Sequence, residues 1–411
     1  MNTNVRKISM LFLCSLFIAS CPSLFAWDFG LTFNQNLGVS GYGSDSGFRY
    51  SGSLVPRVSG LVGGESDYYV SAGVEAAYLD GLAFIPELLR TEFTFRSGAL
   101  AVKAGRMYHS DPLGLIASGL FDGARVSYDS PFGSFYAGAW YTGLLYKKRI
   151  SIEMTAADYE LTNSPLNTDD YANTYFAPKR MVAGLGWEHL SLGGETSASA
   201  ALLGQFDFTG EAINSQYIAG KVVLPVKAFS DGFSLDLGAC FQLIQQSGNF
   251  GTGFTAELGV SFAPPISLSS KLSLLARYAS GASGGIAYAF LPVTTVSQGN
   301  ILGAKLSGIS MISVDYTAQL YNTLQAGISS SYFIRNDLKT YRDYPLSSES
   351  IEGNGKGIFL GNEFFARLLW SPFSDIQVNL GGGVFLPSMG DAGPKAGSSW
   401  RVELNAILYL Y

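Results

Sequence analysis

The sequence has little charge, few histidines and almost no cysteine. Charged residues make up 14% of the 411 residues, whereas a soluble domain carries about a quarter. Only two histidines and three cysteines are present, which leaves little material for histidine-based catalysis or a cysteine-rich metal site. A chain this poor in charge cannot readily cover a water-facing surface of its own size, so two or three ordinary soluble domains are disfavoured.

Long apolar runs are missing beyond the N-terminus. No uninterrupted run of about 18 apolar residues occurs there, so helices that span a membrane are also disfavoured. The chain does contain 49 glycines, 14% aromatic residues and 47% hydrophobic residues, and this hydrophobic content argues against disorder. A membrane β-barrel, in which lipid replaces water on one face, is the class that fits these numbers.

Residues 1–26 have the layout of a secretory signal peptide. Arg6 and Lys7 form a basic start, and residues 8–19 form an apolar core that is too short to span a bilayer. Ala26 is a small residue at a suitable cleavage point. Cleavage there predicts a signal peptide over 1–26, and it implies export across the inner membrane.

The mature chain is then 27–411, which we expect to be one outer-membrane barrel. A rival cleavage motif at 18–21 resembles a lipobox and would place a lipid on Cys21. With cleavage after Ala26, Cys240 is the single cysteine that remains, and one cysteine cannot form an intramolecular disulfide.

Apolar and polar residues alternate along the mature chain. The clearest case is 254–262, where even-numbered residues are apolar and odd-numbered residues are polar or glycine; 233–243, 312–320 and 376–380 repeat the pattern. A soluble sandwich would bury the apolar face, whereas a membrane barrel turns it toward lipid. The polar faces are small and rich in glycine, and the apolar faces recur in more runs than one sandwich core can absorb, so the barrel is favoured.

The predicted fold is an all-β, transmembrane, antiparallel up-and-down β-barrel of about 18 strands, with 16 as the nearest competing count. The expected strands are 27–39, 48–62, 67–79, 87–97, 99–106, 121–129, 134–146, 180–190, 196–208, 216–226, 232–246, 252–262, 269–280, 306–320, 325–335, 359–371, 375–386 and 398–411.

The connections between these strands alternate in length, as short periplasmic turns and long external loops do in outer-membrane barrels. The long connections are 107–120, 147–179, 281–305 and 336–358. The last strand ends in the aromatic Tyr411, as such barrels usually do, which implies recognition by the barrel-assembly machinery. It departs from the pattern because 407–411 is apolar at every position.

With apolar side chains placed toward lipid, the charges that face the lumen follow. Five cations on neighbouring strands form a predicted basic wall, namely Arg57, Arg90, Arg96, Lys103 and Arg125. Three acids across the ring form a predicted acidic wall, namely Asp236, Glu257 and Asp315. Opposed walls would orient polar solutes and filter ions. The alternative is that these charges pair with neighbours and only solvate the wall.

The loop 107–120 is the candidate constriction. It contains Tyr108, His109 and Asp111 among several apolar residues, and it is too apolar for a freely solvated external loop. Folding inward to narrow the pore accounts for this composition, and packing over the barrel rim is the alternative.

The flanks of this loop carry a family resemblance. Gly105-Arg106 before the loop and 120–126 (LFDGARV) after it resemble the corresponding region of outer-membrane porins of the alginate-export class. The resemblance implies an eighteen-stranded barrel that passes acidic sugars through an arginine-lined lumen. The lumen predicted here is mixed in charge, which departs from that pattern.

No catalytic residue, metal site or cofactor is expected. His109 lies in an external loop and His189 near a periplasmic strand end, so they cannot act together in catalysis or in metal binding. The acids of the loop 147–179 fit a weak calcium site or, more simply, a solvated surface. The sequence contains no phosphate-cradling motif and no basic surface for nucleic acid.

The sequence therefore predicts an outer-membrane porin for passive diffusion of small hydrophilic solutes, anionic or sugar-like ones included. Its expected partners are the lipid bilayer, the barrel-assembly machinery and the solutes, and assembly as a homotrimer is left open. One alternative is an adhesin or structural barrel that uses loops 147–179 and 336–358. The other is a long-chain fatty-acid-type channel, which needs an apolar inner groove where the alternation predicts serine, threonine, glutamine and glycine.

Overall fold

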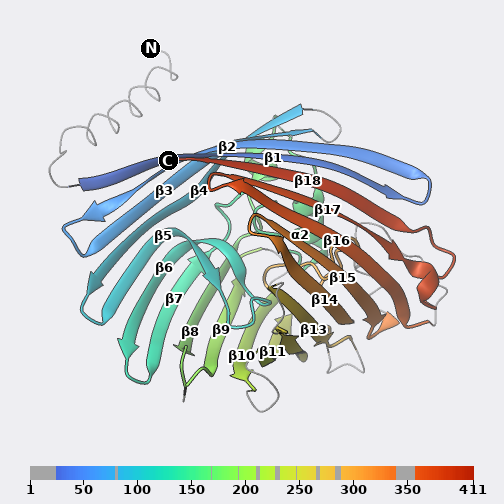
Figure 1. The fold of residues 1–411 in the computed structure, drawn as a ribbon. Helices are drawn as coiled ribbons and strands as arrows, with labels where there is room; N and C mark the ends of the chain where they lie inside the picture. The colour runs from blue at the N-terminus through green and yellow to red at the C-terminus, as the bar shows by residue number, and fades with distance from the viewer. Residues whose placement is uncertain are drawn as a thin grey trace.

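Eighteen antiparallel strands form one closed ring in the computed structural model (Figure 1). The structure describes residues 25–78, 82–167, 169–192, 194–209, 213–226, 232–246, 248–264, 269–282, 288–338 and 357–411. The strands are β1 Phe25–Tyr42, β2 Asp45–Val62, β3 Ser66–Tyr78, β4 Leu82–Ser97, β5 Leu100–Ser110, β6 Ser118–Ser130, β7 Gly133–Tyr141, β8 Arg180–His189, β9 Ser197–Asp207, β10 Ile213–Pro225, β11 Phe233–Gln246, β12 Asn249–Phe262, β13 Ser270–Ala279, β14 Ile309–Tyr321, β15 Leu324–Arg335, β16 Phe359–Phe373, β17 Ile376–Leu386 and β18 Ser399–Leu410.

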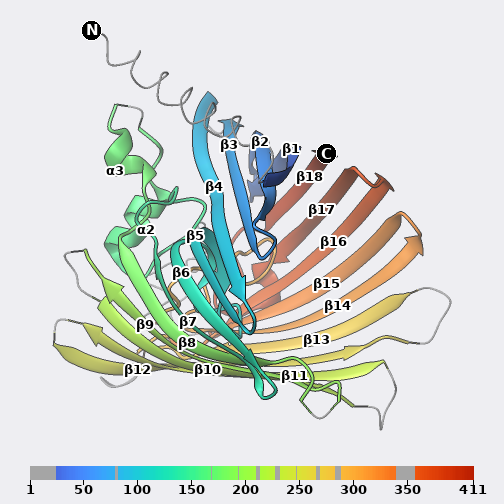
Figure 2. The same ribbon diagram turned by 90° about the vertical axis from the view of Figure 1, so that its left-hand side faces the viewer.

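Every strand pairs with its neighbours in sequence, and β1 closes the ring by pairing with both β2 and β18. The predicted up-and-down antiparallel barrel and its strand number are therefore confirmed. Two short helices, α2 Ala156–Asn163 and α3 Tyr171–Tyr175, lie in the long connection after β7 at one end of the barrel (Figure 2). A 3-10 turn, η1 Pro387–Met389, follows β17. Among the described residues, no helix is long and apolar enough to cross a membrane.

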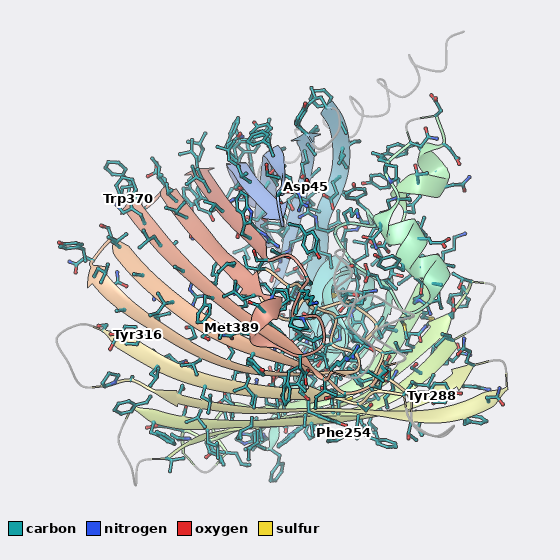
Figure 3. The ribbon with its side chains drawn as sticks, turned by 90° about the vertical axis from the view of Figure 1, so that its right-hand side faces the viewer. Asp45, Phe254, Tyr288, Tyr316, Trp370 and Met389 are labelled. Carbon is teal, nitrogen blue, oxygen red and sulfur yellow. The ribbon has the colours of Figure 1, made fainter. Side chains whose placement is uncertain are left out.

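The outer face of the barrel is apolar, because side chains alternate between the two faces of a strand. Phe254, Tyr316 and Trp370 point away from the lumen on three strands (Figure 3). The same alternation applies to the wholly apolar end of β18. Leu408 and Leu410 pair with the outward residues of β1, so the intervening residues face inward.

Several predicted boundaries are wrong. β7 ends at Tyr141 instead of 146, and the connection 107–120 shrinks because β5 continues to Ser110 and β6 begins at Ser118. The predicted signal peptide falls largely on residues 1–24, outside the described residues. β1 begins at Phe25, so cleavage after residue 26 would remove the first two residues of this strand.

A buried apolar cluster lies inside the barrel and corrects the expectation of a polar lumen throughout. Inward side chains of β7–β11 pack against connections that fold into the ring. The connection predicted as an external loop at 281–305 belongs to them, since Phe290, Val293 and Ala304 are completely buried. A sequence alternation shows which face a side chain occupies, but it does not show which loops will cover that face.

Candidate permeation pathway

The tip of the β5–β6 hairpin leaves the barrel wall. β5 and β6 remain paired with each other as far as Ser110 and Ser118. Their pairing with the outer neighbours β4 and β7 ends earlier, at Arg106 and Asp122. The tip beyond these two residues is therefore free of the wall on both sides and can bend into the lumen.

Two paired glycines lie at the bend where the β5–β6 hairpin departs from the barrel wall. Gly105 lies opposite Gly123 and has φ +112°, a conformation that residues with a side chain rarely adopt. A Cβ on Gly105 would collide with the backbone carbonyl oxygen of Thr91 on β4, and one on Gly123 with that of Ala139 on β7. Glycine is therefore required at both positions for the close approach of the neighbouring strands.

Arg106 stabilises the chain at this bend. Its Nε and Nη2 atoms donate to the two carboxylate oxygens of Asp122 at 2.8 and 2.9 Å, and such bidentate pairs fix geometry strongly. Nη2 also donates to the carbonyl oxygen of Leu144 at 2.9 Å, and Nη1 to that of Leu88. The guanidinium thus bridges β4 and the chain after β7 where the hairpin departs. No role for Arg106 was predicted from the sequence, although Gly105-Arg106 is part of the family resemblance.

The hairpin tip is held by the carboxylate of Asp111. This buried side chain accepts hydrogen bonds from the backbone N–H groups of Leu113, Ile116 and Ala117 at 2.8 to 2.9 Å. Burial raises the pKa of Asp111, and the three N–H donors oppose that shift. The tip reaches the opposite strands, because a Cβ on Gly238 of β11 would lie 2.5 Å from Cδ2 of Leu113.

The other two residues predicted in the constriction are separated by the alternation of β5. His109 is buried and stacks on Trp140 with ring centroids 3.8 Å apart. Tyr108 is exposed, and its hydroxyl lies 2.9 Å from Oγ of Ser118. The inward fold of this hairpin is thus observed, whereas the part that Tyr108, His109 and Asp111 play in permeation stays a prediction.

A second inward segment, 288–308, crosses the barrel between two anchors. At one anchor, Tyr217 of β10 and Gln242 of β11 donate to the carbonyl oxygen of Leu291 at 2.8 and 2.9 Å. At the other, Glu363 of β16 accepts hydrogen bonds from the backbone N–H groups of Asn300, Ile301 and Leu302 at 2.6 to 2.9 Å. Both anchors are buried polar groups with their hydrogen bonds satisfied, so they fix the path of this segment.

The predicted basic wall contains acids as well as cations. Glu92 accepts from Arg90 at 2.8 Å and from Lys103 at 3.1 Å, so the two cations share one carboxylate. Arg96 pairs with Asp67 on the neighbouring strand β3. The register that places these cations together places Glu92 and Asp67 among them.

The remaining two cations of the basic wall contact aromatic rings. The guanidinium of Arg125 lies 4.0 Å from the ring centroid of Tyr136 and 3.8 Å from the carboxylate of Glu188. Arg57 lies over the ring of Tyr411, 4.9 Å from its centroid. Alternation in the sequence places these two cations toward the lumen, but it does not predict Tyr136, Glu188 or Tyr411 as their partners, because these residues lie elsewhere in the chain.

The predicted acidic wall is also paired. Glu257 accepts from Lys221 at 2.9 Å and from Arg277 at 3.2 Å. Asp315 accepts from Arg367 at 3.2 Å. One oxygen of Asp236 is buried and has no hydrogen-bond partner among the described residues. Neutral pairs produce a weaker field at a distance than single charges do, so the transverse field between the two walls stays a prediction.

An uncharged stretch of the inner wall was missed by the sequence analysis. It is an asparagine cluster that we define as Asn34, Asn36, Asn379 and Asn405, on β1, β17 and β18. Asn405 Nδ2 donates to Oδ1 of Asn34 at 2.6 Å and of Asn36 at 2.5 Å, and Asn379 donates to Asn405 at 3.2 Å. Strand alternation already places all four toward the lumen, so the signal was present in the sequence.

Solved structures share this fold. The chain is similar to Pseudomonas aeruginosa OccK2 (OpdF) in complex with glucuronate, with TM-score 0.62, 12% identity and coverage of 94% of this chain and 97% of that one. It is also similar to OpdK from the same organism with vanillate, with TM-score 0.62, 11% identity and coverage of 93% and 98%. P. aeruginosa OprD gives TM-score 0.56, 12% identity and coverage of 93% and 95%. No protein-family model and no curated protein sequence matches the chain.

Proposed function

We propose that the chain is an outer-membrane porin through which small hydrophilic solutes diffuse without an energy source. The observation that carries the proposal is the contrast between the two faces of one closed ring. The outer face presents leucine, phenylalanine, tyrosine and tryptophan, which lipid tolerates and water does not. The inner face keeps a polar stretch on β17, β18, β1 and β2 that is half-buried or exposed.

Similarity in fold to OccK2, OpdK and OprD supports a channel of this general kind. It extends along nearly the whole chain, and it includes a barrel that is described with glucuronate and another described with vanillate. Acidic solutes of that size therefore belong among the first probes for this chain. The local resemblance of 105–126 to alginate-export porins supports the same choice of acidic sugars.

The proposal includes a route to the membrane. Cleavage of 1–26 would deliver 27–411 to the periplasm, where the aromatic end of β18 fits recognition by the barrel-assembly machinery. Protein sequencing of the purified mature chain tests this step, with Trp27 as the expected first residue. Chemical cross-linking of the protein in its membrane tests whether three barrels assemble.

Single-channel recording of the refolded mature protein in a planar bilayer tests the function. We expect discrete conductance steps, because the polar stretch of the inner wall lies beside the inward segments and not beneath them. A correctly folded barrel without such steps would favour a structural barrel or an adhesin. The adhesin alternative named loops 147–179 and 336–358. The first loop contains the completely buried Lys147 and exposed residues such as Asn163 and Asp170, and residues 339–356 of the second lie outside the described residues, so this alternative stays a prediction.

A measurement of ion selectivity tests the role of the basic wall in permeation. We propose that Arg90, Arg96, Lys103 and Arg125 help to set it, so replacing all four by Gln should shift the reversal potential toward cation preference. The acids Glu92, Asp67 and Glu188 would then face the lumen without their cations. Lys395→Gln, an exposed position between β17 and β18, is the matched control. An unchanged reversal potential in the fourfold variant would exclude the basic wall from permeation.

A further inference from the structure

A cavity of about 440 Å³ lies against the inner wall formed by β15–β18 and β1. Its lining includes Asn36, Asn379 and Asn405 of the asparagine cluster, and Asn300 from the tip of the inward segment 288–308. Sites for small molecules occupy about 300–1,000 Å³, so this cavity has the size of a solute site. It is bounded on one side by the wall and on the other by a segment that Glu363 holds in place.

The asparagine cluster keeps both kinds of hydrogen-bonding group available. Each primary amide offers two N–H donors and a carbonyl oxygen with two lone pairs. Asn379 uses one donor toward Asn405, and Asn36 accepts from Asn405 while donating to Ser51 at 3.5 Å. These bonds within the cluster fix the orientation of the amides and leave further donors and acceptors for a solute.

The charges beside the cavity are balanced. Arg367, which lines it, pairs with Asp315 at 3.2 Å, and Glu403, which also lines it, lies 3.7 Å from Arg401. A carboxylate solute would gain most from a cation that has no acid beside it, and both of these cations already have one. A hydroxyl group, which donates and accepts at once, matches the amides and needs no charge.

Apolar surface completes the lining. Phe365 and Leu369 point inward from β16 and contribute to the cavity. A pyranose ring presents hydroxyl groups at its edge and C–H groups on its faces, so it can use amides and an apolar patch together. Phe365 also belongs to the edge of the buried apolar cluster, so the cavity lies where that cluster meets the amides of the wall.

We propose that this cavity is a binding subsite for a neutral, hydroxyl-rich solute of pyranose size, selected by the asparagine cluster. The inference rests on the proposed porin function, because the subsite lies on the permeation pathway. The expected preference for a neutral solute differs from the acidic solutes found with the structural neighbours and implied by the resemblance to the alginate-export class.

Glucose and glucuronate form a matched pair of probes, because they differ by a carboxylate in place of a hydroxymethyl group. Each is added to single channels of the refolded full-length mature protein, and the concentration that produces half-maximal block of the ion current is measured. We expect glucose to block at a lower concentration than glucuronate. Stronger block by glucuronate, or no block by glucose, would overturn the inference while leaving the porin function intact. Absence of any ion conductance would instead contradict the porin function.

Asn405→Leu removes the central amide at nearly constant volume. Both N–H groups of Asn405 are used toward Asn34 and Asn36, so this change acts by releasing the amides that Asn405 orients. Loss of their fixed orientation predicts an approximately tenfold rise in the half-blocking glucose concentration, the equivalent of about 1.4 kcal/mol, with a smaller change for glucuronate. Asn36→Leu is a second variant that keeps the Asn379–Asn405 contact, and it should show the same direction. Asn173→Leu, on exposed α3, is the control. Folding of each variant is checked by its heat-sensitive electrophoretic mobility. If both lumen variants fold and the half-blocking glucose concentration is unchanged in both, the proposal is wrong.

Discussion

The two sides of the inner wall differ in what covers them. On the covered wall, the inward faces of β7–β11, side chains such as Trp140, Val182 and Tyr217 are buried beneath the inward connections. On the open wall, the inward faces of β17, β18, β1 and β2, most side chains are amides, hydroxyls and ion pairs, and Asn36 is exposed. Phe385 of β17 is the exception at one end, because it belongs to the buried cluster. Both walls follow the same two-residue alternation.

This difference shows that one part of a barrel interior can hold packed loops while another part remains open to water and solutes. Large inward side chains on the covered wall provide a surface on which loops pack as in a soluble core. Small and polar inward side chains on the open wall offer no such surface, so water and solutes occupy the space beside it. The proposed permeation pathway therefore lies beside the open wall, where the inward connections find no large apolar surface on which to pack.

We expect the largest difference in the free energy of unfolding between variants of two arginines, one on each wall. Arg180 is completely buried on the covered side, where it pairs with Asp158 of α2 and, at 3.2 Å, with Asp207. Arg180→Met leaves two buried carboxylates without their cation, so we expect a loss of about 3–5 kcal/mol. Arg401→Met on the open wall breaks a partly exposed pair and should cost about 0–1 kcal/mol. Denaturant unfolding in detergent measures both, and equal losses would remove the distinction between the walls.

Two phenylalanines test the packing. Phe121→Ala deletes a completely buried ring from the cluster inside the barrel and should cost about 3–5 kcal/mol, because a cavity remains. Phe93→Ala deletes an outward ring that is 45% exposed; lipid or detergent can fill that space, so the loss should stay within about 1.5–3 kcal/mol. The same unfolding measurement compares them. A larger loss for Phe93 would mean that the interior is loosely packed.

The anchor at Glu363 should control the mobility of the segment 288–308. Glu363→Gln keeps one acceptor oxygen and places an amide near the remaining N–H groups, which we expect to cost about 1–3 kcal/mol locally. Backbone hydrogen exchange at residues 300–302 should accelerate, and channel recordings should become noisier. Glu403→Gln on the open wall is the control, and it should leave exchange at 300–302 unchanged.

The smallest effect concerns pH and the hairpin tip. Burial raises the pKa of Asp111 above its ordinary value, so the folded tip binds a proton more readily than the unfolded chain does. Its stabilising contribution is therefore complete below the ordinary pKa and is lost as the pH rises through the folded pKa. Thermal unfolding of the native protein and of Asp111→Asn over acidic pH measures this difference. Stability that falls on acidification relative to the variant would contradict the assigned sign.

Local sequence patterns are enough to predict the barrel. Alternation in segments such as 254–262 fixes which side chains face outward, and turn residues separate the strands, so strand number and pairing order follow from local patterns. The same patterns placed Arg90, Lys103, Glu257 and Asp315 toward the lumen. These properties are local, because each depends only on residues that are near one another in the chain.

The tertiary structure decided what the lumen contains. Arg106 meets Asp122 and the carbonyl oxygen of Leu144, and Glu363 meets the N–H groups of 300–302, contacts that join residues distant in sequence. The partners of the basic wall and the burial of the segment 288–308 arise in the same way. Alternation assigns a side chain to a face, but only the closed ring brings distant strands and loops within hydrogen-bonding distance, and this separates the covered wall from the open one.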